Sequence, residues 1–139
     1  MTNPSKAKGT AAETAVVRYA RAHGFPLADR LTLSGRYDRG DVLLCPGAIL
    51  EVKAGRAAQN ASYGQILAWL DETERERVNA HADTAGLVVQ RRGYGLGRVE
   101  CWEFWYWATY PFPGVAQRPL ADGLRMLRWS GWGEPLEES

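Results

Sequence analysis

The residues whose types and spacing could carry out chemistry lie on two neighbouring apolar runs of the chain. Asp41 opens the run 41–44, and Glu51 and Lys53 belong to the run 49–53. Because side chains alternate between the two faces of a strand, Glu51 and Lys53 share one face. A hairpin between the runs would bring Asp41 beside Glu51. Two converging carboxylates suit Mg²⁺ or Mn²⁺, and a lysine beside them can hold a water or stabilise charge on a phosphate. The pattern therefore predicts metal-dependent cleavage of a phosphodiester.

Other candidate metal ligands are weaker. Asp38 precedes Asp41 by three residues and is the main rival for its role, but Asp41 directly precedes the apolar run that would pair with the Glu51 strand. The cysteines and histidines show no metal-ligand spacing, which argues against zinc and favours reduced core thiols; they are Cys45, Cys101, His23 and His81.

The length and composition are those of a single globular domain. The chain has 139 residues, with ordinary apolar and charged fractions. No apolar run approaches the roughly 18 residues of a membrane span, and the polar, basic N-terminus lacks the apolar centre of a signal peptide. We therefore expect a cytoplasmic protein without a membrane partner.

The charge is near neutral overall but unevenly distributed. Residues 1–56 carry nine Lys and Arg against five Asp and Glu, and the remainder carries eight against eleven. A basic surface around an acidic metal site suits a polyanionic substrate. The alternative is scattered surface charge without function.

The elements that must position these residues can be read from the pattern of apolar residues. We expect helices at about 10–23, 57–79 and 120–127, and strands at about 29–33, 41–45, 48–54, 85–90 and 99–107. This order suggests an α/β sandwich with a mixed sheet. Residues 1–9 are expected to form a flexible basic arm, 10–110 the main domain and 111–139 an extension rich in Pro, Gly and Trp.

Two charged parts of the expected helices have alternative interpretations. Thr10 and Glu13 resemble a capping box, which would make Glu13 structural, but Glu13 also lies beside the inward face and could point at the metal site. The charged segment 71–77 of the later helix is interpreted as a solvated face rather than a binding motif.

Taken in order, these segments resemble the PD-(D/E)xK nuclease superfamily, and more narrowly the archaeal and phage Holliday junction resolvases. The resemblance covers roughly residues 6–107. One departure is Gly40, which stands where the family has a proline before the metal-binding aspartate. The matching elements are Lys8-Gly9 with Glu13, Arg30 with Ser34-Gly35, Gly40-Asp41, Glu51-Val52-Lys53, the helix carrying Gln65 and a strand ending in basic residues.

The resemblance implies a restriction endonuclease-like α/β/α sandwich with a central mixed β-sheet and a role for each matching residue. Asp41, Glu51 and the Val52 carbonyl would bind Mg²⁺, with Mn²⁺ able to substitute, and Glu13 would complete the cluster. Lys53 would position the attacking water, and Ser34 would lie near the scissile phosphate. The DNA backbone would be contacted by Lys6, Lys8, Arg30, Arg36, Arg39 and Arg56.

The function implied by the resemblance is resolution of four-way DNA junctions by a two-fold dimer, leaving 5′-phosphates; a phage origin belongs to the same expectation. The aromatic segment 101–107 could form the dimer interface, pack in the core or stack on unpaired bases. Three alternatives remain at this stage: another endonuclease of the superfamily acting on duplexes or flaps, a non-catalytic DNA-binding or assembly protein, and a structural α/β domain in which the Glu-x-Lys pattern is fortuitous.

Overall fold

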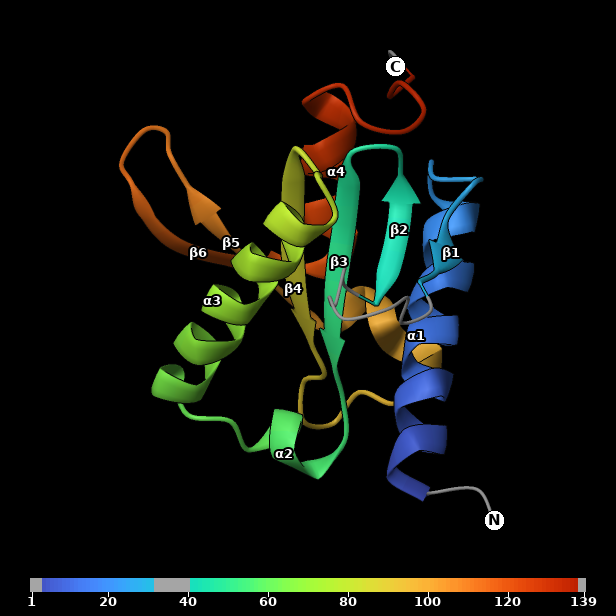
Figure 1. Ribbon diagram of the computed structural model, residues 1–139. Helices are drawn as coiled ribbons and strands as arrows, with labels where there is room; N and C mark the ends of the chain where they lie inside the picture. The colour runs from blue at the N-terminus through green and yellow to red at the C-terminus, as the bar shows by residue number, and fades with distance from the viewer. Residues whose placement is uncertain (1–3, 32–40, 138–139) are drawn as a thin grey trace.

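A six-stranded mixed sheet forms the centre of the molecule (Figure 1). The computed structural model describes residues 4–31 and 41–137. The strands lie in chain order across the sheet, and β3 and β4 run parallel while every other neighbouring pair is antiparallel. The elements are α1 (Pro4–Ala22), β1 (Asp29–Arg30), β2 (Val42–Cys45), β3 (Ala48–Lys53), α2 (Arg56–Gln59), α3 (Tyr63–Asn79), β4 (Thr84–Val89), the 3₁₀ segment η1 (Leu96–Cys101), β5 (Glu103–Ala108), β6 (Gly114–Pro119) and α4 (Leu120–Trp129).

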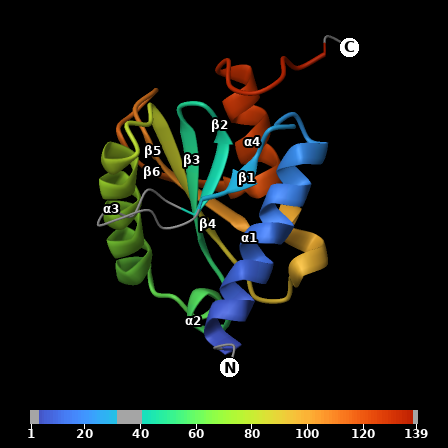
Figure 2. The ribbon, with the colours of Figure 1, turned by 45° about the vertical axis from the view of Figure 1, so that its right-hand side comes forward.

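Helices cover both faces of the sheet, because successive side chains of the central strands enter two separate apolar clusters. Leu50 and Val52 of β3 pack with α1, α4 and Trp102 on one face. On the other face, Leu87 and Val89 of β4 pack with α3. Figure 2 shows α1 and α3 on opposite sides of the sheet. The fold is thus a three-layer α/β arrangement, and β3 presents Glu51 and Lys53 on the α3 side.

The hairpin predicted for the two apolar runs is confirmed. Strands β2 and β3 pair antiparallel, with Val42 opposite Leu50 and Leu43 opposite Ile49. The chain reverses at Gly47, whose positive φ of 90° glycine adopts without strain. Alternate residues of β2 are buried and β3 is buried from Ala48 to Val52, so a shift of one residue would move Val42 and Leu44 out of the core.

The N-terminal helix begins earlier than the sequence suggested. Helix α1 starts at Pro4, so residues 4–9 are helical rather than a flexible arm, and Thr10 is inside the helix instead of capping it. Proline suits the first turn of a helix, since its missing N–H has no intrahelical partner there.

The helix expected over 57–79 is two helices. Helix α2 ends at Gln59 and α3 begins at Tyr63, where the Ser62 side chain accepts a hydrogen bond from the Gln65 N–H at 3.1 Å. A serine cap satisfies one of the unpaired donors at a helix start. The break creates a turn between the two helices next to the Lys53 end of β3.

The segment beyond residue 110 belongs to the same sheet and core. Strand β6 pairs with β5 along its whole length, and helix α4 buries Leu120, Leu124 and Leu127. Trp102 and Phe104 of the aromatic segment are also core residues, whereas the Trp107 side chain stays about half exposed. Within the described residues, no helix combines the length and apolar character that a membrane crossing needs.

Candidate active site

The sheet register places Asp41 directly across from Glu51. Because Val42 pairs with Leu50, the residue before Val42 lies opposite the residue after Leu50. The Asp41 N–H donates to the Leu50 carbonyl at 3.0 Å, and the Val52 N–H donates to Asp41 Oδ2 at 2.8 Å. The predicted proximity of the two carboxylates is confirmed.

The Val52 carbonyl faces the same edge of β3. In an extended strand the N–H and C=O of one residue point to the same side and alternate along the chain. The Lys53 carbonyl accepts from the Gln90 N–H on the β4 side, and the Val52 N–H donates to Asp41 on the β2 side. The Val52 carbonyl therefore points toward the β2 side, where the sequence prediction requires a backbone ligand.

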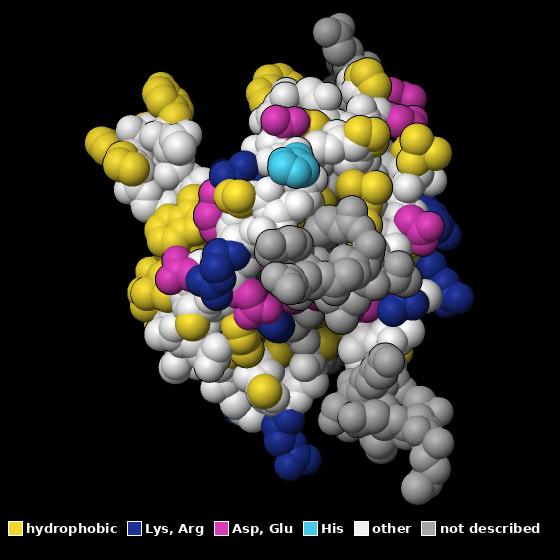
Figure 3. Space-filling model, viewed as in Figure 1, with side chains coloured by type: hydrophobic (Ala, Val, Ile, Leu, Met, Phe, Trp, Pro, Cys, Tyr) yellow, Lys and Arg dark blue, Asp and Glu magenta, His cyan; other side chains and the backbone are white. Residues whose placement is uncertain are grey.

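Two glutamates of α3 complete the cluster. Carboxylate oxygens of Glu51, Glu72 and Glu76 all lie within 4.8 Å of one another. Glu51 and Glu76 are almost completely buried, at 4% and 2% exposure. Residues four apart share one helix face, so Glu72 and Glu76 reach β3 together. In the space-filling view of Figure 3, acidic and basic side chains lie next to one another near the middle of the visible side of the molecule.

The acids of this cluster perturb one another. Burial raises the pKa of Glu51 to about 12, and hydrogen bonding to Glu76 and the nearby Asp41 charge add to the shift. Glu51 Oε2 accepts no hydrogen bond from the part of the chain that the structure describes. A buried set of converging carboxylates is costly unless protons are shared or a cation compensates the charge.

Lys53 supplies positive charge at the edge of the cluster. Its ammonium lies 3.5 Å from Glu51 Oε1 and 3.2 Å from Glu72 Oε1, and 5.6 Å from the centre of the Trp69 ring. Burial lowers the Lys53 pKa, but the charges of Glu51 and Glu72 outweigh burial and raise it above its ordinary value. The ammonium therefore stays charged at neutral pH.

Glu13 forms an ion pair with Arg30, a contact that the sequence did not predict. Its Oε2 accepts hydrogen bonds from Arg30 Nε and Nη2, each at 3.3 Å. Arg30 pairs with Val42 across β1 and β2, so the ion pair fixes α1 to the edge of the sheet next to Asp41. The helical residues whose carboxylate oxygens lie within 4.8 Å of Glu51 are Glu72 and Glu76, and both belong to α3.

The remaining predicted residues lie at the margins of the site or outside the described part. Arg56 is exposed at the start of α2, beyond the end of β3. The backbone of Lys6 and Lys8 belongs to α1, and their side chains are not described. Ser34, Arg36 and Arg39 lie outside the described residues, as does Asp38.

Sequence reasoning missed Glu72 and Glu76 because it treated segment 71–77 as a solvated face. Nearly every residue of that segment is charged, so the sequence does not make clear which of them point into the protein. One signal was available: Ile66, Leu70 and Thr73 continue the buried side of α3, and both glutamates flank that line. The interpretation of the whole segment as solvated was wrong for these two residues.

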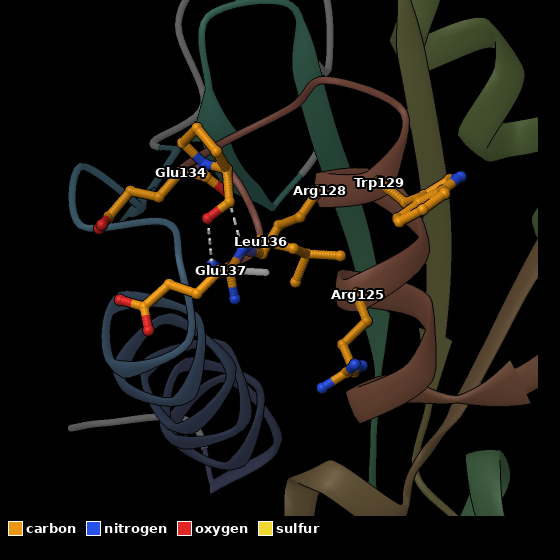
Figure 4. A pocket seen from close by; sticks show the side chains of 7 residues that line it. Arg125, Arg128, Trp129, Glu134, Leu136 and Glu137 are labelled. Carbon is orange, nitrogen blue, oxygen red and sulfur yellow. Dashed lines mark hydrogen bonds between the residues drawn. The ribbon is translucent and has the colours of Figure 1, made fainter. Parts of the chain in front are cut away.

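Another pocket lies away from the carboxylate cluster. A hollow of about 780 Å³ separates α4 from the C-terminal segment and is lined by Arg125, Arg128 and Glu137 among others (Figure 4). The Arg128 guanidinium there donates to the carbonyls of Glu134 and Pro135, at 2.8 and 2.9 Å. This arginine ties down the C-terminal segment, and the pocket shares no lining residue with the carboxylate cluster.

Comparisons with models of protein families, with curated proteins and with solved structures find no match to this chain.

Proposed function

We propose that this protein is a divalent-metal-dependent endonuclease that cuts DNA, with Glu51 at the centre of its active site. The observation that carries the proposal is the convergence of Asp41 and Lys53 with Glu51, Glu72 and Glu76, of which Glu51 and Glu76 are buried. Carboxylate oxygens are hard ligands of the kind that Mg²⁺ and Mn²⁺ prefer.

The described residues fit a metal ion of this class. Three carboxylates offer oxygens within 4.8 Å of one another, and Glu51 Oε2 accepts no hydrogen bond from the described residues. Asp41 and the Val52 carbonyl approach from the neighbouring edge of β3. A bound metal ion would lower the pKa of a water and shield the charge of a phosphate.

The protein's own groups would act around that ion. The acids bind and fix the cation, and the hydrogen bond from the Val52 N–H holds Asp41 in position. Because the Lys53 ammonium remains protonated, it suits stabilisation of negative charge developing on the phosphate better than general-base catalysis. The Glu13–Arg30 pair holds α1 against the same edge of the sheet.

The proposed substrate is branched DNA, with the four-way junction as its most specific form and a 5′-phosphate as the product end. Support for the junction is the sequence resemblance to resolvases. Support for the phosphodiester chemistry is the ammonium held among converging carboxylates.

The test is cleavage of end-labelled four-way junctions and matched linear duplexes in Mg²⁺ or Mn²⁺. Glu51→Gln, Asp41→Asn and Lys53→Met should each lower the cleavage rate by about 10²–10³-fold, the range seen when a charge-stabilising group is lost. Glu74→Gln is the control, because Glu74 is exposed on α3 and pairs with Arg77. Equal activity of all four variants would refute the site, and equal cutting of junction and duplex would refute the junction preference.

A further inference from the structure

A second pocket opens next to the carboxylate cluster, at the break between α2 and α3. It has a volume of about 530 Å³, within the range of small-molecule sites. The segment that joins α2 to the lower end of α3 in Figure 1 contributes part of its lining. The lining residues are Arg56, Ala57, Asn60, Ala61, Ser62, Gln65 and Trp69.

The Trp69 ring connects this pocket to the proposed catalytic residues. Trp69 lines the pocket, and the Lys53 ammonium lies 5.6 Å from the centre of the same ring. Trp69 also packs against the apolar cluster beneath α3, so the ring is held in place while part of it faces solvent. A group stacked on this indole would lie next to the position where Lys53 meets a phosphate.

The charge at the pocket suits a polyanion. Arg56 is exposed and lines the pocket, and the Arg92 guanidinium donates a hydrogen bond to Oδ1 of Asn60, another lining residue. Among the described residues that line the pocket there is no Asp or Glu. Cationic side chains here would attract a phosphate backbone, whereas the acidic cluster beyond Trp69 would repel one without a metal ion.

The pocket also has the mixed surface that a nucleobase needs. Trp69, Ala57 and Ala61 are apolar, and the Gln65 side-chain amide can both donate and accept hydrogen bonds. Bases within a duplex are stacked on both sides, so an aromatic ring on the protein can stack only on a base that is unpaired or flipped out.

We infer that this pocket binds one unpaired nucleotide of the substrate strand beside the scissile phosphate. The base stacks on Trp69, and Arg56 contacts the adjoining backbone phosphate. This assignment rests on the proposed nuclease function and adds that the substrate strand presents an unpaired nucleotide at the branch point, as a four-way junction does when a base beside its crossover is unstacked. The same site would bind single-stranded DNA with no metal present, because none of its contacts uses the carboxylates.

The first experiment measures binding alone. A fluorescein-labelled single-stranded oligonucleotide is titrated with the protein in EDTA and followed by fluorescence anisotropy. Trp69→Ala and Arg56→Ala should each weaken binding about tenfold or more, and Trp69→Phe should retain most of the affinity. Trp129→Ala and Arg75→Ala are the matched controls, since both side chains are exposed on other surfaces. Equal affinity of Trp69→Ala, Trp69→Phe and the wild type would overturn the assignment.

The second experiment compares cleavage of a four-way junction that carries unpaired nucleotides at its branch point with cleavage of a fully paired four-way junction. The wild-type protein should cut the substrate with unpaired nucleotides faster, and Trp69→Ala should remove that difference while Trp69→Phe keeps it. If Trp69→Ala leaves the ratio of the two cleavage rates unchanged, the nucleotide assignment is overturned. The proposed nuclease function is tested separately, by the loss of cleavage in Glu51→Gln. Conversely, if Trp69→Ala loses oligonucleotide binding but neither the wild type nor any variant cleaves DNA, the nucleotide site is supported and the proposed nuclease function is refuted.

Discussion

Glu51 is a buried carboxylate whose closest partners are mostly other acids. Asp41, Glu72 and Glu76 approach it from two elements, and Lys53 is the described cation beside it. Removing such a group from water favours its neutral form unless a cation is present. This environment accounts for the raised Glu51 pKa and gives the cluster a physical reason to bind a divalent metal ion.

Metal binding should depend on the α3 glutamates that the sequence interpretation overlooked. We expect Glu76→Gln to weaken Mn²⁺ binding about 10–100-fold or more, because it removes a charged oxygen from the group. Isothermal titration calorimetry measures this directly, with Glu74→Gln on the outer face of α3 as the control. An unchanged Mn²⁺ affinity in Glu76→Gln would exclude α3 from the metal site.

The raised pKa of Glu51 predicts how stability depends on pH. The folded protein binds this proton more tightly than the unfolded chain, so the stabilisation is complete below the ordinary pKa of 4.5 and falls as pH rises toward about 12. Without metal, the free energy of unfolding should therefore fall from pH 5.5 to pH 8.5, and less steeply in Glu51→Gln. Urea denaturation in EDTA measures both slopes; parallel slopes would contradict the assignment.

The stabilisation by a metal ion should depend on pH in the opposite direction to the stability of the metal-free protein. Carboxylates must lose their protons to bind a cation, so Mn²⁺ affinity should increase between pH 5.5 and pH 8.5. The stabilisation that a fixed Mn²⁺ concentration produces should increase in parallel. Thermal unfolding at each pH, with and without Mn²⁺, gives this difference, and an equal shift at both pH values would count against carboxylate ligation.

At the scale of elements, two contacts decide where the site forms. The β2–β3 hairpin fixes Asp41 opposite Glu51, and α3 lies across β3 and β4 so that its inner face reaches the same point. On the opposite face, α4 approaches the sheet closely at Gly123, where an added Cβ would lie 2.6 Å from Phe104 Cγ. Close packing there supports β5, the neighbour of β4.

This packing makes Gly123→Ala a test of the α4 contact. Phe104 is 1% exposed and has no space to move away, so the substitution should destabilise the protein by about 1–3 kcal/mol through overpacking. Gly64→Ala in α3 is the matched control: its nearest neighbour would be Ser62 Oγ at 3.8 Å, and alanine should stabilise the helix by up to about 1 kcal/mol. Urea denaturation measures both, and a stabilising Gly123→Ala would contradict the close approach.

At the scale of the whole molecule, one chain carries one such carboxylate cluster among its described residues. Paired, symmetric cuts in a junction require two sites, and the two-fold dimer is the simplest assembly that provides them. The hairpin between β5 and β6 projects from the body and leaves Tyr110 and Phe112 exposed, at 88% and 79% (Figure 1). Exposed aromatic side chains are enriched at interfaces between subunits.

We therefore expect sedimentation equilibrium to give twice the 15.4 kDa mass of one chain, with or without DNA. Tyr110→Ser combined with Phe112→Ser should shift the equilibrium toward the monomer and uncouple the two cuts in a junction. Arg75 is exposed on α3, so Arg75→Ala is the control for a surface substitution outside the hairpin. A wild-type monomer that still makes paired cuts would refute the dimer.

Local sequence determined the parts of this protein that depend on neighbouring residues. The apolar runs on either side of Gly47 specify the hairpin, and with it the meeting of Asp41 and Glu51, because a register shift of one residue would move Val42 and Leu44 out of the apolar core. The positions of β4 and α4 also followed from their apolar patterns, with boundaries correct to within two residues.

Tertiary structure decided what distant segments contribute. Glu72 and Glu76 become site residues only because α3 packs across β3 and β4. The line of Ile66, Leu70 and Thr73 marks the inward side of α3, but it does not say which strand that side meets. Glu13, which the family resemblance assigned to the metal site, forms an ion pair with Arg30 of β1, because helix α1 packs on the sheet face opposite to α3 (Figure 2). Sequence periodicity thus specified the hairpin that holds two of the acids, and the packing of helices against the sheet selected the others.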